Sequence, residues 1–284
     1  DKKTNITTLE FASNGIPLCD WEDRQDKLES ILNVHLIEFT QGKSKNKIIL
    51  RTVSGDIGLP KFMYWKDRYL SDEDFTLVLG KSITDHVTVN LAKIPHILLG
   101  GSTGSGKSVL LKLLIMQCVK KDADVFIADF KGGVDFPILW HEKCNIITEE
   151  HTLLELLTKL VEELENRKKL LRTSGCANIG EYNLLCGSTT LKRIIFACDE
   201  IAEVLDKTGL SKEAKETVLQ IENKLSVIAR QGRAFGIHLI LATQRPDANI
   251  LTGQIRNNID FRVCGRADNV LSQIILDNTK AADE

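Results

Sequence analysis

From about residue 76 onward, apolar runs alternate with longer stretches of helical periodicity. Four of these runs are continuously apolar, which is the pattern of strands buried on both faces of a helix-covered parallel sheet: HILLG (96–100), DVFIADF (124–130), RIIFACD (193–199) and HLILATQ (238–244). A fifth run, FRVCGR (261–266), shows the same character more weakly. Strands that alternate with long helices predict an α/β fold.

Three segments between these runs predict helices. SVLLKLLIMQCVKK (108–121) follows the first strand, and TLLELLTKLVEELENRKKLLR (152–172) repeats leucine at helical spacing with Glu–Lys pairs four residues apart. KEAKETVLQIENKLSVIARQGR (212–233) places Val218, Ile221, Leu225 and Ile228 on one face. Each of these helices therefore has an apolar face that can cover a sheet.

Residues 1–75 have a different rhythm. A helical pattern at 21–32 precedes two predicted strands, 34–40 and 47–53, which flank the polar loop QGKSKN (41–46) as in a hairpin. We therefore expect a small N-terminal α+β subdomain with its linker over 1–75, closed by the aromatic-rich LPKFMYWKDRYL (59–70). The remaining residues, 76–284, would form the main domain.

The composition is that of an ordinary globular protein. With 37 Lys and Arg against 39 Asp and Glu, the net charge is −2, and 43% of residues are apolar, which excludes disorder as the dominant state. Because there is no basic surplus, a polyanionic partner would have to be held by a local patch or by a ring of copies.

The sequence carries no transmembrane or secretory signal. Its longest apolar candidate, VLLKLLIMQCV (109–119), falls short of the roughly 18 residues that a membrane span needs and contains Lys112. The start has no apolar signal-peptide core and no initiator methionine, so we expect a fragment of a longer chain. Seven cysteines without metal-binding spacing indicate reduced, buried thiols in a cytosolic setting.

The sequence GSTGSGKS (101–108) fits the phosphate-loop pattern G-x-x-x-x-G-K-[ST] in full, between a predicted strand and a predicted helix. Its glycines let the backbone wrap closely and point N–H groups at a phosphate, and the helix that opens near Lys107 adds its positive dipole end. Lys107 can reach the β- and γ-phosphates, and the Ser108 hydroxyl can bind Mg²⁺. We therefore predict that ATP and Mg²⁺ bind at Gly101, Ser102, Thr103, Gly104, Ser105, Gly106, Lys107, Ser108 and Val109.

A second candidate motif is the strand RIIFACDE (193–200), which ends in two carboxylates. Ligands bind at the carboxyl edge of open α/β sheets, so Asp199 is expected to hold Mg²⁺ through its water shell. Glu200 would polarise the attacking water as a general base. The pair could alternatively be the acidic first turn of a solvated helix, but the phosphate loop upstream favours a nucleotide site.

The strand at 238–244 ends in Thr243–Gln244. The Gln244 amide could sense the γ-phosphate or position water, unless the strand is simply terminated there. Cleavage of the γ-phosphate also needs positive charge, often an arginine from a neighbouring subunit. Three arginines near predicted helix ends are candidates, although each could be an ordinary surface arginine: Arg167, Arg230 and Arg233.

The segment ADFKGGVDF (128–136) follows the second strand and offers Asp129, Lys131 and two glycines. It could be a mobile loop that reports the nucleotide state, or it could be a plain turn. The residues themselves leave both interpretations open.

Four segments together resemble the FtsK/SpoIIIE family of motor ATPases, within the HerA/FtsK superfamily: NLAKIPHILLGGSTGSGKS (90–108), IIFACDEIAEVL (194–205), RQGRAFGIHLILATQRP (230–246) and TGQIRNNIDFRVCGR (252–266). The resemblance implies a RecA-like P-loop domain that forms hexameric rings, binds nucleotide between subunits and pumps duplex DNA through the channel. It also implies a membrane tether outside this sequence, which makes the chain the cytoplasmic domain of a membrane-anchored bacterial protein.

The resemblance carries site roles residue by residue. Lys107 and Ser108, with Asp199 and Glu200, match the family's two nucleotide motifs, and Gln244 matches its sensor position. An arginine near Arg233 or Arg167 would act in trans. The residues before 76 resemble, less clearly, the small subdomain that family members place beneath the motor.

There are departures from the family pattern. ADFKGGVDF is closer to type VII secretion ATPases and to coupling proteins of Gram-positive conjugative elements than to cell-division translocases. No winged-helix module is present, and the sequence stops at DNTKAADE, where the family usually continues into a last strand. We therefore expect a conjugative coupling protein that contacts DNA phosphates without reading bases, with a relaxase and secretion-channel proteins as partners. A protein-secretion ATPase and a non-hydrolysing nucleotide-binding scaffold remain alternatives.

Overall fold

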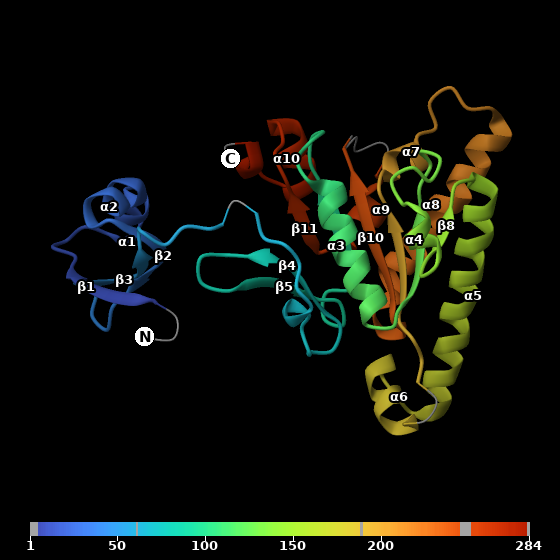
Figure 1. Ribbon diagram of the computed structural model, residues 1–284, viewed down its shortest axis with the longest axis horizontal. Coiled ribbons are helices and arrows are strands. Elements are labelled where there is room, and N and C mark those ends of the chain that lie inside the picture. Colours follow the sequence, from blue (N-terminus) through green and yellow to red (C-terminus); the bar gives the residue numbers. More distant parts are fainter. Residues whose placement is uncertain (1–4, 61, 188–189, 245–250, 283–284) are drawn as a thin grey trace. The chain divides into compact units, whose positions relative to one another are not determined.

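The computed structural model describes residues 5–60, 62–187, 190–244 and 251–282 (Figure 1). The chain forms two compact units. One comprises Asp1–Tyr69 with Gly80–Val87, and the other comprises Leu70–Leu79 with Thr88–Glu284. The expected domain boundary at 75/76 falls inside Leu70–Leu79, which belongs to the larger unit. Each unit is made of two separate stretches of the sequence.

The smaller unit has a three-stranded antiparallel sheet in the order β1-β3-β2. The expected hairpin at 34–53 is confirmed, with β3 at the centre of the sheet and Ile48, Leu50 and Val53 buried. The expected helix at 21–32 is two helices, because the backbone leaves the helical region at Arg24 (φ −108°, ψ 19°). The elements are β1 (Thr7–Ala12), α1 (Leu18–Glu22), α2 (Gln25–Leu32), β2 (Val34–Gln41) and β3 (Lys47–Ser54).

The larger unit is built on a six-stranded parallel sheet in the order β11-β6-β10-β9-β7-β8. All five expected strands are present, and the three-residue edge strand β8 was not expected. The sheet confirms a RecA-like α/β fold. Its strands are β6 (Ile97–Gly100), β7 (Asp124–Ala128), β8 (Asn145–Ile147), β9 (Ile194–Cys198), β10 (Ile237–Thr243) and β11 (Phe261–Cys264).

Three long helices cover the two faces of this sheet: α3 (Lys107–Lys120) on one face, and α5 (Glu150–Ser174) with α8 (Lys212–Phe235) on the other (Figure 1). Side chains of β9 explain why its sequence is continuously apolar. Phe196 packs into the core shared with α5 and α8, whereas Ile195 and Ala197 pack into the core shared with α3. Burying one such large side chain contributes about 1.5–3 kcal/mol, so both cores stabilise the sheet.

Shorter elements complete the fold. A two-stranded sheet pairs β4 with β5, and α10 follows β11 and packs against β6. These elements are η1 (Asp67–Tyr69), β4 (Thr76–Lys81), β5 (His86–Asn90), α4 (Ile138–His141), α6 (Ile179–Cys186), α7 (Ile201–Leu205), α9 (Gly253–Arg256), α10 (Asn269–Leu276) and η2 (Lys280–Ala282).

Two expectations from composition can be compared with these elements. All seven cysteines are free thiols, and four are buried, although Cys19 is exposed. Within the described residues, the helices are too short or too polar to cross a lipid bilayer.

Because every pair in the six-stranded sheet is parallel, the strands end at one common edge. Four segments that are distant in sequence begin there: the loop after β6 at 101–106, the loop after β7 at 129–136, Asp199 after β9 and Gln244 after β10. The fold thereby assembles the candidate site.

Candidate functional site

The phosphate loop connects β6 to α3, as the sequence predicts. Gly104 (φ 78°) and Gly106 (φ 87°) occupy left-handed conformations that glycine adopts without strain. The residues after the neighbouring strand β11 hold the loop in place, because Ser102 N–H donates to the Arg266 carbonyl at 2.9 Å. Val109, the last residue of the predicted nucleotide-binding set, points outward and is 74% exposed.

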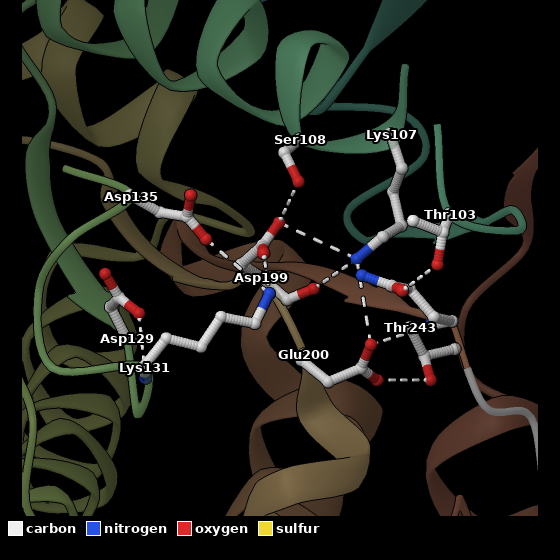
Figure 2. Close-up of polar contacts among 10 residues, drawn as sticks. Thr103, Lys107, Ser108, Asp129, Lys131, Asp135, Asp199, Glu200 and Thr243 are labelled. Carbon is white, nitrogen blue, oxygen red and sulfur yellow. Dashed lines mark hydrogen bonds and ion pairs between the residues drawn. The ribbon is translucent and has the colours of Figure 1, made fainter. Parts of the chain in front are cut away.

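The structure brings the phosphate loop to the acidic strand end. The Lys107 ammonium donates to the main-chain carbonyl of Asp199 at 2.6 Å and lies 3.6 Å from its Oδ1 (Figure 2). The Ser108 hydroxyl donates to Asp199 Oδ1 at 2.8 Å. A hydroxyl and a carboxylate oxygen in contact are the donor types that Mg²⁺ takes, so Ser108 and Asp199 fit the metal role predicted for them.

Glu200 is the second acid, and it is buried. Its Oε1 accepts from the Thr243 hydroxyl at 2.7 Å, its Oε2 accepts from Gln244 N–H at 2.8 Å, and Lys107 Nζ lies 3.9 Å from Oε2. Thr103 in turn donates to Gln244 Oε1 at 3.0 Å. Gln244 therefore links the phosphate loop to Glu200, the carboxylate that the sequence predicts to be the general base.

A lysine that sequence reasoning did not place in the site completes this cluster. Lys131 Nζ lies 2.9 Å from Asp199 Oδ2 and 3.5 Å from Asp135 Oδ2. Asp129 is 2% exposed, and its Oδ1 accepts from Lys131 N–H at 3.1 Å. The signal in the sequence was a lysine followed by two glycines directly after a strand end, which left a nucleotide-sensing loop and a plain turn equally open.

The electrostatics of the cluster hold Asp199 ionised. Burial alone would raise the pKa of Asp199, but the hydrogen bond from Lys131, the charge of Lys107 and the hydrogen bond from Ser108 lower it below its usual value. Burial also opposes the charge on Lys131, but the hydrogen bond that it donates to Asp199 and the nearby negative charges of Asp199, Asp135 and Glu203 together outweigh that effect and raise the pKa of Lys131. The site therefore contains a carboxylate that stays charged and two cations placed around it.

The three candidate arginines lie elsewhere. Arg167 is only 4% exposed, so it is not a surface arginine; it donates to Glu163 Oε1 and to the Phe235 carbonyl, each at 2.7 Å. Arg233 lies near the end of α8, which precedes the start of β10 and so marks the amino edge of the sheet. Arg230 is exposed. Among the described contacts, none of the three reaches the phosphate loop or the acidic pair of its own chain, so a role in trans stays a prediction.

The phosphate loop, the Asp199 carboxylate and the buried Glu200 meet at the carboxyl edge of a parallel sheet. This arrangement defines a RecA-like P-loop ATPase domain. The FtsK/SpoIIIE family model matches residues 63–248. The chain belongs to the FtsK/SpoIIIE family.

Individual relatives agree with this assignment. The DNA translocase FtsK of Chlorobaculum tepidum is 34% identical over 71% of this chain and 26% of its own length, and that of Helicobacter pylori strain J99 is 33% identical over 74% and 25%. The chain thus spans about a quarter of the length of these curated relatives.

Two solved structures are similar to most or all of this chain. The monomeric form of the pCW3 conjugation coupling protein TcpA with ATPγS is 42% identical with a TM-score of 0.79, covering 100% of this chain and 80% of that one. The cytoplasmic domain of the type VII secretion ATPase EccC of Thermomonospora curvata is 24% identical with a TM-score of 0.59, over 82% of this chain and 28% of that one, and shares the fold.

Proposed function

We propose that this chain is the ATP-hydrolysing motor of a DNA translocase that serves as a conjugative coupling protein. The observation that carries the proposal is the joining of the phosphate loop, Asp199, Glu200 and Gln244 at one sheet edge. The 42% identity to a conjugation coupling protein over the full chain supports conjugation as the process.

In this proposal each site residue has a chemical role. Lys107 leaves the Asp199 carbonyl to bind the β- and γ-phosphates, and the N–H groups of residues 101–106 cradle the phosphate oxygens. Ser108 and Asp199 would hold Mg²⁺, which would supply positive charge beside the phosphate oxygens. Glu200 orients the attacking water and accepts its proton, because Thr243 and Gln244 N–H fix both of its oxygens.

Motion would arise where the γ-phosphate is sensed. The side chain of Gln244 contacts Thr103 in the phosphate loop, and its backbone N–H holds Glu200. A change in the phosphate loop on nucleotide binding therefore reaches the end of β10 through one residue. Movement of the cargo requires that the nucleotide-bound and nucleotide-free states contact it differently.

The cargo and assembly complete the proposal. DNA would be held through its phosphates, in a hexameric ring with nucleotide between subunits and an arginine such as Arg167, Arg230 or Arg233 acting on a neighbour's nucleotide. Because one chain has a net charge of −2, the surface that holds DNA would have to be a local cationic patch repeated around the ring. Anchoring to the cell membrane, a relaxase and secretion-channel proteins belong to the same proposal.

The test compares ATP turnover with duplex DNA, with single-stranded DNA and without DNA. We expect DNA to stimulate phosphate release, and the stimulation to fall steeply between 50 and 200 mM salt, as about 6–10 phosphate contacts would require. Lys107→Ala is the control for turnover by a contaminant. If neither duplex nor single-stranded DNA changed the rate of ATP turnover, translocation of DNA would be contradicted, and the ATPase assignment would stay in place.

A further inference from the structure

The loop between β7 and α4 reaches the carboxylate of Asp199 through the side chain of Lys131. Lys131 donates to Asp199 Oδ2 at 2.9 Å, while Ser108 donates to Asp199 Oδ1 at 2.8 Å. Both oxygens of the carboxylate therefore already have a partner within the chain, and the oxygen facing the loop has a cation as its partner (Figure 2).

The ends of this loop are buried, and its middle is exposed. At one end Asp129 is buried, and its N–H donates to the Ile147 carbonyl at 2.9 Å. At the other end Phe136 is 1% exposed and packs edge-on against Trp140 with a centroid distance of 5.5 Å. Between them Val134 is 79% exposed.

The two glycines that follow Lys131 leave open space around the loop. Gly132 (φ 79°) and Gly133 (φ 76°) both adopt left-handed conformations, and an added Cβ would meet nothing within 4 Å at Gly132 and only a methyl group at 3.9 Å at Gly133. The ion pairs of Lys131 with Asp199 and Asp135 are the charged contacts described for the exposed part of the loop.

Magnesium and the lysine need the same carboxylate. Mg²⁺ binds through one or two carboxylates, directly or through its waters, and the Lys131 ammonium at 2.9 Å from Oδ2 already occupies one oxygen of Asp199. Lys107 already lies 3.6 Å from Asp199 Oδ1, so Mg²⁺ would be a third cation beside Lys131 at this buried carboxylate, and the repulsion among them would be stronger than in water. We propose that Lys131 occupies the metal's place on Asp199 when no nucleotide is bound, and that Mg²⁺ exchanges with it when ATP binds.

This exchange deepens the proposed function, because it assumes that ATP and Mg²⁺ bind at this site. Lys131 then acts as a positioning residue. It keeps Asp199 oriented toward Ser108 in the nucleotide-free chain, and its release frees the loop at 131–134 only when metal and nucleotide are both present. The loop thereby reports an occupied site on the outer surface of the domain.

The test measures how much Mg²⁺ is needed to bind a non-hydrolysable fluorescent ATP analogue. Lys131→Met removes the competing cation and preserves the length of the side chain. Because the competing ammonium holds Asp199 through a charge-assisted hydrogen bond, we expect half-saturation at roughly ten- to a hundredfold less Mg²⁺. Lys131→Arg should restore the wild-type midpoint. Lys143→Met, which removes an exposed lysine just beyond α4, is the matched control and should leave the midpoint unchanged.

Backbone hydrogen exchange over 129–136 is the second measurement. In the wild type, exchange should become faster with Mg²⁺ and the analogue together, and not with the analogue in EDTA. Lys131→Met should exchange fast without any ligand.

An unchanged Mg²⁺ midpoint in Lys131→Met, or loop exchange that stays the same or slows when Mg²⁺ and analogue bind, would overturn the exchange while leaving the proposed ATPase intact. Failure of the wild type to bind the analogue at any Mg²⁺ concentration would instead overturn the proposed function, and this inference with it.

Discussion

Replacing Glu200 with glutamine separates nucleotide binding from hydrolysis in a way that the contacts of this side chain make specific. Its two oxygens accept from Thr243 Oγ1 at 2.7 Å and from Gln244 N–H at 2.8 Å. In Glu200→Gln the amide oxygen can keep the bond from Gln244 N–H. The amide nitrogen can then donate to Thr243 Oγ1, because a hydroxyl can also accept.

The energetic cost to the fold should therefore be small. The variant exchanges charge-assisted hydrogen bonds for neutral ones at an unchanged position, a loss of about 1 kcal/mol in the free energy of unfolding. An amide cannot accept the proton of the attacking water. Loss of a general base slows turnover by about 10²–10⁴-fold.

The assay is steady-state phosphate release at saturating ATP, with nucleotide affinity measured on the same protein. We expect affinity within a few-fold of the wild type and turnover reduced by at least about a hundredfold. Glu216→Gln, at an exposed position on α8, is the matched control. If Glu200→Gln turned over within tenfold of the wild type while binding normally, Glu200 would not be the base, and its contacts with Thr243 and Gln244 would be structural.

Two further substitutions test other parts of the domain. Lys107→Ala removes the buried ammonium that lies 3.6 Å from Asp199 Oδ1 and 3.9 Å from Glu200 Oε2. Because two charge-assisted contacts to phosphate would be lost, nucleotide affinity measured by calorimetry should fall at least about a hundredfold. Unchanged affinity would refute the role of Lys107 in binding phosphate. Burial lowers the pKa of His96 to about 4. As the pH falls, the unfolded chain therefore takes up this proton before the folded chain does. The contribution of His96 to the free energy of unfolding is fully present above pH 6.5 and is lost as the pH falls toward 4. Between pH 7 and 5 this group should account for about 2 kcal/mol of lost unfolding free energy. His96→Asn, whose side-chain oxygen can still accept from Leu239 N–H, should remove that part of the loss in urea titrations, and an unaltered pH dependence would contradict the assignment.

The strands and the phosphate loop could be predicted because their signals are local. A strand buried on both faces, such as β9, must be apolar at every position, and its two cores show why. The phosphate loop needs glycine where φ is positive, at Gly104 and Gly106, and that requirement is written in consecutive residues.

What the sequence could not supply depends on the order of strands in the sheet. β10 lies between β6 and β9, although some 40 residues separate it from β9 along the chain and many more separate it from β6. Only that placement brings Thr243 and Gln244 to Glu200. The edge strand β8 has three residues, too few for a pattern.

Side-chain partners were the least predictable feature. Lys131 is an ordinary loop lysine in the sequence, and its role emerges only because β7 lies beside β9, so that the loop after β7 starts next to Asp199. Arg167 was expected near the surface as a helix-end arginine. It is buried because its guanidinium satisfies the carbonyl of Phe235 at the end of α8.

The two neighbouring acids differ in how their partners are attached, and that difference separates their roles. The side-chain oxygens of Asp199 are bound by the Ser108 hydroxyl, which is itself a candidate Mg²⁺ ligand, and by the ammonium of a loop residue, which a metal ion can displace. One oxygen of Glu200 is bound by a backbone N–H at the end of β10, which nothing can displace without moving the strand end. Asp199 is therefore suited to exchange one cation for another. Glu200 is suited to stay where it is relative to Gln244, so that whatever moves Gln244 also moves the base.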